Sequence, residues 1–176
     1  MATVFEQYKA LNIDGSLISL EQVEDVYPYF CYPTNAKAIG FEGCIMYCFI
    51  DGYGETVFAS NPETCADAYV YPLARSFKDF IGLILACGSA NLIEQIVWMN
   101  KEQFEQHMKA EQDIRTDAQK KVLEQIKTKM DISPIEDPFE YVKEVQRDFD
   151  GSNIAYSDEY YDVLGIERYI CVYRTE

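Results

Sequence analysis

The architecture follows from residues 43–59, which read G-C-I-M-Y-C-F-I-D-G-Y-G-E-T-V-F-A. An almost unbroken apolar run is followed, across D-G-Y-G, by a second, shorter apolar run. Two such runs around a glycine-bearing turn predict a β-hairpin. Further outward, residues 69–71 (Y-V-Y) predict a third strand that ends at Pro72. The aromatic, proline-bearing residues 27–33 (Y-P-Y-F-C-Y-P) predict an edge strand.

Helical spacing replaces the strand pattern after the third strand. Ser76 is a good N-cap, and Asp79 three residues later makes a variant of the capping box. The apolar side chains that follow recur at helical spacing as far as Gly88, a natural helix end. Few positions of this helix are polar, so we expect it to lie in the core. Residues 92–97 carry a second, short apolar stripe.

A long charged segment comes next, over residues 101–130. Asn100 opens it with a capping box, and its seven basic and six acidic side chains leave it almost neutral. Acidic residues that precede basic ones at i, i+4 favour a solvated helix, which is either continuous or broken near 113–117. Asp137 and Pro138 then mark the start of another helix.

The order of these patterns indicates the fold class. Residues 168–173 (R-Y-I-C-V-Y) are a strand by composition, so strands, then helices, then a strand predict an α+β fold. With 176 residues and no low-complexity linker, we expect a single domain over 1–176. The first 40 residues are weakly patterned, and residues 17–26 suit a short helix or the approach to a strand.

The charge balance excludes whole classes of partner. Thirty acidic and fifteen basic residues give a net charge of −15. Nucleic acid and anionic membranes attract clustered lysine and arginine, so neither is expected to bind. No apolar run approaches the roughly 18 residues of a membrane span. The first six residues, M-A-T-V-F-E, do not resemble a signal peptide, so the sequence predicts a cytoplasmic protein.

The residues that usually carry chemistry form no convincing site. Six cysteines are spread along the chain without a Cys-x-x-Cys pair, which indicates reduced, structural cysteines. The single histidine, His107, has no nucleophile at helical spacing and is expected on the surface. Gly52 and Gly54 suit a hairpin turn, and residues 148–153 suit the end of a helix better than a calcium loop. We therefore expect no catalytic residue, cofactor or metal.

Tyrosine is unusually frequent, with fourteen residues, and many of them adjoin acids. Residues 156–162 read Y-S-D-E-Y-Y-D, either a surface loop or a segment that binds a partner. Tyrosine is enriched at interfaces, and carboxylates beside it suit a partner rich in lysine and arginine. The candidate partner-binding residues are Asp158, Glu159, Tyr160, Tyr161 and Asp162. The nearly neutral helix 101–130 is the weaker candidate, because its thin apolar stripe is expected to serve its own domain.

Residues 69–88 (Y-V-Y-P-L-A-R-S-F-K-D-F-I-G-L-I-L-A-C-G) resemble a segment of the SUKH superfamily, in which a strand leads into a core helix. The residues that match are Ala74, Ser76, Phe77, Phe80 and Ile81. The resemblance covers about residues 43–100. It implies a bent antiparallel sheet packed against helices and a binding role without catalytic residues. In this superfamily that role is commonly the neutralisation of a secreted toxin.

The functional expectation is therefore a non-catalytic, cytoplasmic protein-binding module. Its expected partner is a protein with a basic surface, such as a toxin domain of a bacterial conflict system, which the chain would neutralise as an immunity protein. Two alternatives remain. One is a regulatory or scaffold protein of the SUKH type, similar to its cell-wall-assembly regulators. The other is a small-ligand-binding protein or enzyme that uses a pocket between sheet and helices.

Overall fold

The computed structural model describes residues 1–168. At its centre is a four-stranded antiparallel sheet with the order β1-β2-β3-β4. The strands are β1 (Ala36–Glu42), β2 (Ile45–Ile50), β3 (Val57–Ser60) and β4 (Val70–Ala74). The helices around the sheet are α1 (Val4–Ala10), the 3-10 helix η1 (Gly15–Ile18), α2 (Phe77–Cys87), α3 (Ala90–Gln95), α4 (Lys101–Ile114), α5 (Asp117–Met130), α6 (Pro138–Arg147) and α7 (Asp158–Leu164). The fold is α+β, as the sequence predicts.

The predicted hairpin is present as β2 and β3. Gly52 and Gly54 in its turn have φ values of 95° and 62°, which glycine adopts without strain. The third strand is also present as β4, but it does not end at Pro72 as predicted; it continues to Ala74. A proline is tolerated there because β4 is an edge strand, which forms backbone hydrogen bonds to a neighbouring strand, β3, on one side only.

The edge strand predicted over 27–33 is wrong. Those residues form a loop with a turn at 30–31, and the edge next to β2 is β1, which the sequence did not reveal. Its sequence, A-K-A-I-G-F-E, lacks the β-branched and aromatic enrichment of a strand. Gly40 is needed there because an added Cβ would lie 2.5 Å from Leu20 Cδ1. Leu20 belongs to the undecided stretch 17–26, which contains the end of η1 and a single bridge to β1.

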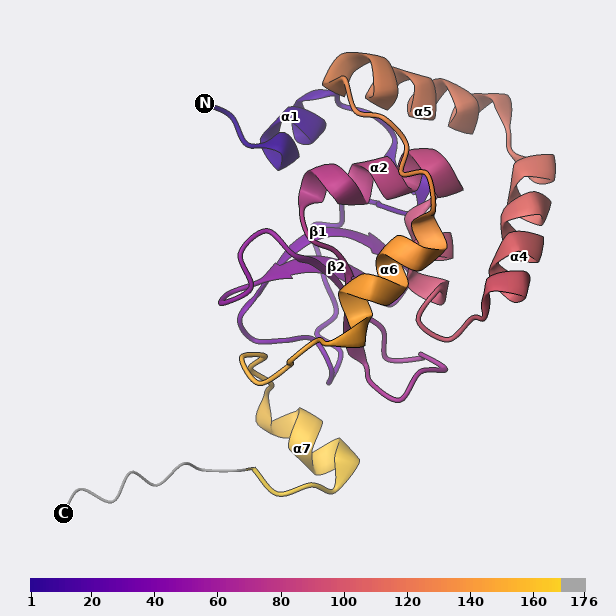
Figure 1. Cartoon of the computed structure of the whole chain (residues 1–176). Helices are drawn as coiled ribbons and strands as arrows, with labels where there is room; N and C mark the ends of the chain where they lie inside the picture. Colours follow the sequence, from indigo (N-terminus) through magenta and orange to yellow (C-terminus); the bar gives the residue numbers. More distant parts are fainter. Residues whose placement is uncertain (169–176) are drawn as a thin grey trace.

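Helix α2 lies across one face of the sheet, with α1, α5 and α6 around it (Figure 1). It begins at the predicted N-cap, where the Asp79 N–H donates to Ser76 Oγ at 3.1 Å, and it ends at Gly88. Most of its side chains are buried, as expected. Gly82 in its middle permits close packing, because a Cβ there would lie 3.1 Å from the Ser133 carbonyl oxygen.

The opposite face of the sheet carries a smaller apolar cluster. Alternate residues of β2, including Met46, Cys48 and Ile50, belong to it, and side chains from segments 27–33 and 148–157 pack against it. Because both faces of β2 are covered, the strand is apolar at almost every position. This explains the unbroken apolar run that marks the hairpin in the sequence.

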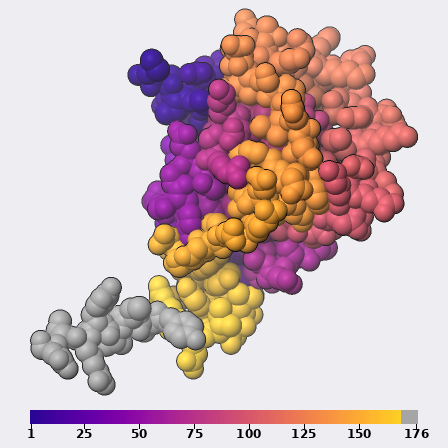
Figure 2. Space-filling model, in the orientation of Figure 1, coloured from indigo at the N-terminus to yellow at the C-terminus, as the bar shows by residue number. Residues whose placement is uncertain are grey.

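The charged segment is two helices, α4 and α5, separated at residues 115–116 within the predicted region of a break. Its apolar stripe contributes to the protein's own core through Val122, Leu123 and Ile126 of α5. Helix α7 lies at the far end of the molecule from α5 (Figures 1 and 2). Of the strand predicted over 168–173, all but the first residue lies outside the described residues.

Candidate functional site

The predicted partner-binding residues lie on α7 and not on a loop. The carboxylates of Asp158, Glu159 and Asp162 are exposed, and Tyr160 and Tyr161 are half-buried. The sequence pattern suggested a loop because acids and aromatics give no apolar stripe, and indeed α7 buries none of its residues. The five candidates are therefore brought together on one short helix at the surface.

Stacked aromatic rings hold α7 against the rest of the protein. The Tyr160 ring lies parallel to that of Tyr156, with centroids 3.7 Å apart, and it also stacks on Phe30 at 6.4 Å. Phe30 in turn meets Tyr69, which directly precedes β4, at 5.0 Å. Edge-to-face contacts between aromatic rings stabilise such clusters beyond the area that they bury. The loop that carries Phe30, residues 23–30, therefore belongs to the same surface as α7.

We call this region the acidic aromatic surface; it consists of α7, Tyr156 and the loop 23–30. The loop adds exposed Glu24 and Asp25, and it leaves 70% of Tyr27 exposed. Exposed apolar side chains lie on α7 and just after it, with Val163 57% exposed and Ile166 49% exposed. Sequence reasoning missed the loop, because the contact between Phe30 and Tyr160 joins segments that are 130 residues apart in the chain.

Among the described residues, Arg168 is the basic residue that pairs with this surface. Arg168 Nη1 donates to Asp158 Oδ1 at 2.6 Å, and its guanidinium lies 5.7 Å from the Tyr161 ring centroid. Both partners of the ion pair are largely exposed, so the pair contributes little to stability. Glu159 and Asp162 are exposed and make no ion pair within the described residues.

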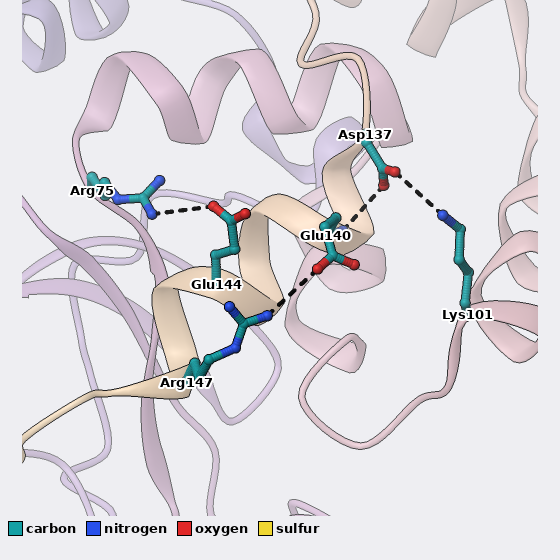
Figure 3. Close-up of polar contacts among 6 residues, drawn as sticks. All are labelled: Arg75, Lys101, Asp137, Glu140, Glu144 and Arg147. Carbon is teal, nitrogen blue, oxygen red and sulfur yellow. Dashed lines mark hydrogen bonds and ion pairs between the residues drawn. The ribbon is translucent and has the colours of Figure 1, made fainter.

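Elsewhere, the acids of α6 are already neutralised. Figure 3 shows the three ion pairs of this region: Arg75 Nη2 to Glu144 Oε2 at 3.6 Å, Arg147 Nη2 to Glu140 Oε1 at 3.5 Å, and Lys101 Nζ to Asp137 Oδ2 at 3.3 Å. All six side chains are about half-exposed, and such pairs mainly keep a surface soluble.

A second group of polar residues is buried between the sheet and α3. The residue Glu94 is only 2% exposed, yet no cation pairs with its carboxylate among the described residues. Its Oε1 accepts a hydrogen bond from Asn61 Nδ2 at 2.9 Å and another from the Tyr71 hydroxyl. The Thr64 hydroxyl lies 3.2 Å from that of Tyr71. Burial and the Glu94 charge raise the pKa of Tyr71, so its hydroxyl stays protonated and donates a hydrogen bond to Glu94.

Glu94 lines an open cavity of ≈ 490 Å³ between β2, the chain after β3, and α3. Glu42, Glu63 and Trp98 also line it. Burial raises the pKa of the Glu42 carboxyl, and the nearby charges of Glu94 and Glu111 act in the same direction. Sequence reasoning missed this site, although an acid inside the apolar stripe 92–97 was a signal for it. We call it the Glu94 cavity.

His107, residues 148–153 and the cysteines are the other candidates that the sequence offered. His107 is exposed, with its ring 6.5 Å from that of Trp98. The Asp150 side chain accepts a hydrogen bond from the Ser152 N–H at 2.9 Å, which is the local geometry of a turn. The cysteines among the described residues are free thiols. Burial raises the pKa of the Cys48 and Cys87 thiols to about 12, so both stay protonated and unreactive.

None of the helices among residues 1–168 has both the length and the apolar character that a membrane crossing demands. Comparisons with protein-family models, with curated proteins and with solved structures give no match for this chain. What the two sites can do therefore follows from their side chains alone.

Proposed function

We propose that the protein is a non-catalytic binding module that covers a basic surface of another protein. We propose further that it acts in the cytoplasm as an immunity protein, neutralising a toxin of a bacterial conflict system. The observation that carries the proposal is the acidic aromatic surface, where the carboxylates of Glu159 and Asp162, which make no ion pair among residues 1–168, stand beside partly exposed rings.

The chemistry of this surface suits association with a cationic protein. Aromatic side chains supply rigid contact area, and they dominate the energetics of many interfaces. Carboxylates around them complement lysine and arginine, accelerate the encounter and disfavour acidic partners. Toxins that cleave nucleic acids need cationic clefts to hold their substrate. An acidic partner can block such a cleft by occupying it.

Charge and resemblance support different parts of the proposal. The net charge of −15 and the exposed acids of α7 support a basic partner. The assignment of that partner as a toxin depends on the resemblance of residues 69–88 to the SUKH superfamily. A regulatory or scaffold protein would use the same surface for a different basic partner.

Co-expression of the chain with the product of the neighbouring gene, followed by purification at low salt, tests the proposal. We expect a stoichiometric complex that dissociates as salt is added, and rescue of cells that express the toxin. Recovery of a stoichiometric basic partner that harms no cell would favour the regulatory alternative. A complex whose formation is insensitive to salt would contradict the acidic aromatic surface as the contact.

Charge-neutralising variants locate the contact. The triple variant Asp158→Asn, Glu159→Gln, Asp162→Asn is expected to slow association about tenfold at low ionic strength and to flatten its salt dependence. The matched control changes exposed acids far from α7, with the same loss of charge: Glu105→Gln, Asp113→Asn and Asp131→Asn. Equal association rates for the two variants would show that only net charge matters and would refute the site.

A further inference from the structure

We propose that the Glu94 cavity binds an organic cation through a guanidinium or ammonium group. This inference goes beyond the proposed function, because the cavity lies among β2, the chain after β3, and α3, whereas the acidic aromatic surface centres on α7. It depends on acceptors that the protein leaves unused, on the charge of the cavity wall and on a tryptophan among the residues that line it.

One oxygen of the buried Glu94 carboxylate, Oε2, accepts no hydrogen bond from the described residues. Both hydrogen bonds that the carboxylate accepts go to Oε1. A buried carboxylate without a compensating cation is costly, since desolvation removes the water that would stabilise it. The Tyr71 and Asn61 donors hold the side chain in place, so Oε2 is a fixed acceptor on the wall of the cavity.

Two further polar groups nearby are also unsatisfied. Glu42 Oε2 and the Tyr47 hydroxyl are buried, and neither has a hydrogen-bond partner within the described residues. Buried polar atoms in folded proteins nearly always have partners, so an unsatisfied one in a residue that lines a cavity indicates a missing ligand or water. Glu42 lines the same cavity as Glu94. Burial and the charges of Glu94 and Glu42 keep the Tyr47 pKa high, so its hydroxyl stays protonated.

The charge of the cavity selects a cation. Glu42, Glu63 and Glu94 line it, and none of the described residues that line it is a lysine or an arginine. Trp98, 39% exposed, is another lining residue. The face of an indole ring attracts cations such as guanidinium. An open cavity of ≈ 490 Å³ has room for such a group together with an alkyl chain.

Trp98 also supplies the assay, because it is the single tryptophan of the sequence. Its fluorescence is titrated with agmatine, with L-arginine and with a short capped peptide that contains one arginine. We expect a saturable change with a Kd on the order of 1 mM, as befits a small cation in an open site. L-citrulline, which replaces the guanidinium by a neutral urea group, is the matched control ligand and should give no saturable change.

The three probes separate the sources of the cation. Binding of agmatine or arginine indicates a free small molecule, whereas binding of the peptide alone indicates an arginine side chain of a protein. Glu94→Gln should weaken binding at least tenfold, since it removes the charge at the fixed acceptor. Glu63→Gln changes an exposed side chain, which leaves folding unaffected, and should weaken binding by a few-fold. Glu136→Gln, an exposed acid outside the cavity, is the control.

Several results would overturn the inference. One is the absence of a saturable change with all three cations in the folded wild-type protein. Another is equal binding of arginine and citrulline, which would show that charge is not recognised. Unchanged binding in folded Glu94→Gln and Glu63→Gln proteins would place the ligand elsewhere. Saturation by Ca²⁺ alone, at a site that the same two variants abolish, would make the cavity a metal site.

Discussion

Replacing Tyr71 by phenylalanine is the sharpest test of the buried Glu94 network. The hydroxyl of Tyr71 donates to Glu94 Oε1, and the ring is only 4% exposed. Phenylalanine keeps the ring and its packing, so the variant removes the hydrogen bond to Glu94 together with the contact of 3.2 Å between the Tyr71 and Thr64 hydroxyls. Asn61 Nδ2 remains bound at 2.9 Å, which leaves the Glu94 carboxylate with one donor from the protein instead of two.

The size of the effect follows from the charge of the acceptor. A hydrogen bond to a charged group contributes about 1.5–3 kcal/mol to stability, against about 1 kcal/mol for a neutral pair. We therefore expect Tyr71→Phe to lower the free energy of unfolding by about 2 kcal/mol. For a domain of this size that corresponds to a decrease in Tm of about 4–8 °C. Urea unfolding followed by circular dichroism measures the free energy directly.

Two comparisons isolate the hydrogen bond. Tyr8→Phe is the matched control, because Tyr8 is equally buried and its hydroxyl makes no hydrogen bond within the described residues; it should cost less than about 0.5 kcal/mol. In a Glu94→Gln background, Tyr71→Phe removes only a neutral bond, so the coupling energy of the double-mutant cycle should be about 1 kcal/mol. A coupling energy near zero, or equal effects of the two tyrosine variants, would refute the network.

Two further predictions concern a helix end and a buried acid. Gly88→Ala should cost more stability than Gly43→Ala, although both glycines have positive φ, because only at Gly88 would the Cβ lie 2.3 Å from Arg115 Nη2; equal urea midpoints would contradict this. Glu42→Gln should stabilise the protein at pH 7–8, because burial raises the folded-state pKa of Glu42 and stability is lost as pH rises through that value. The gain should vanish below the ordinary glutamate pKa of about 4.3, and a gain that is the same at both pH values in thermal unfolding would count against it.

The features that the sequence determined are those whose causes lie within a few residues. Ser76, Asn100 and Asp137 each cap a helix where predicted, because the capping side chain bonds to a backbone N–H three residues later. The hairpin follows from two apolar runs around Gly52 and Gly54, which occupy the left-handed region that the turn needs. The α+β class follows from the order of these local patterns.

The position of the edge strand β1 and the arrangement of the residues in both sites depend on the tertiary structure. Strand β1 forms because β2 offers it a hydrogen-bonding edge, and its own residues have little preference for a strand. Helix α7 was predicted as a surface segment with its five candidate residues, but their helical form and the Arg168 pair were not. Their role in binding stays a prediction.

The Glu94 cavity shows why such sites escape sequence reasoning. Its walls come from residues 42–45, 61–65 and 91–98, and nothing within any one of these segments specifies the other two. The pairing of β2 with β3 and the packing of α3 bring the three segments together. The acidity of one glutamate in an apolar stripe is visible in the sequence. Its burial without a cation depends on the distant residues that surround it, because the solvation of a charge is set by everything within a few ångströms of it in space.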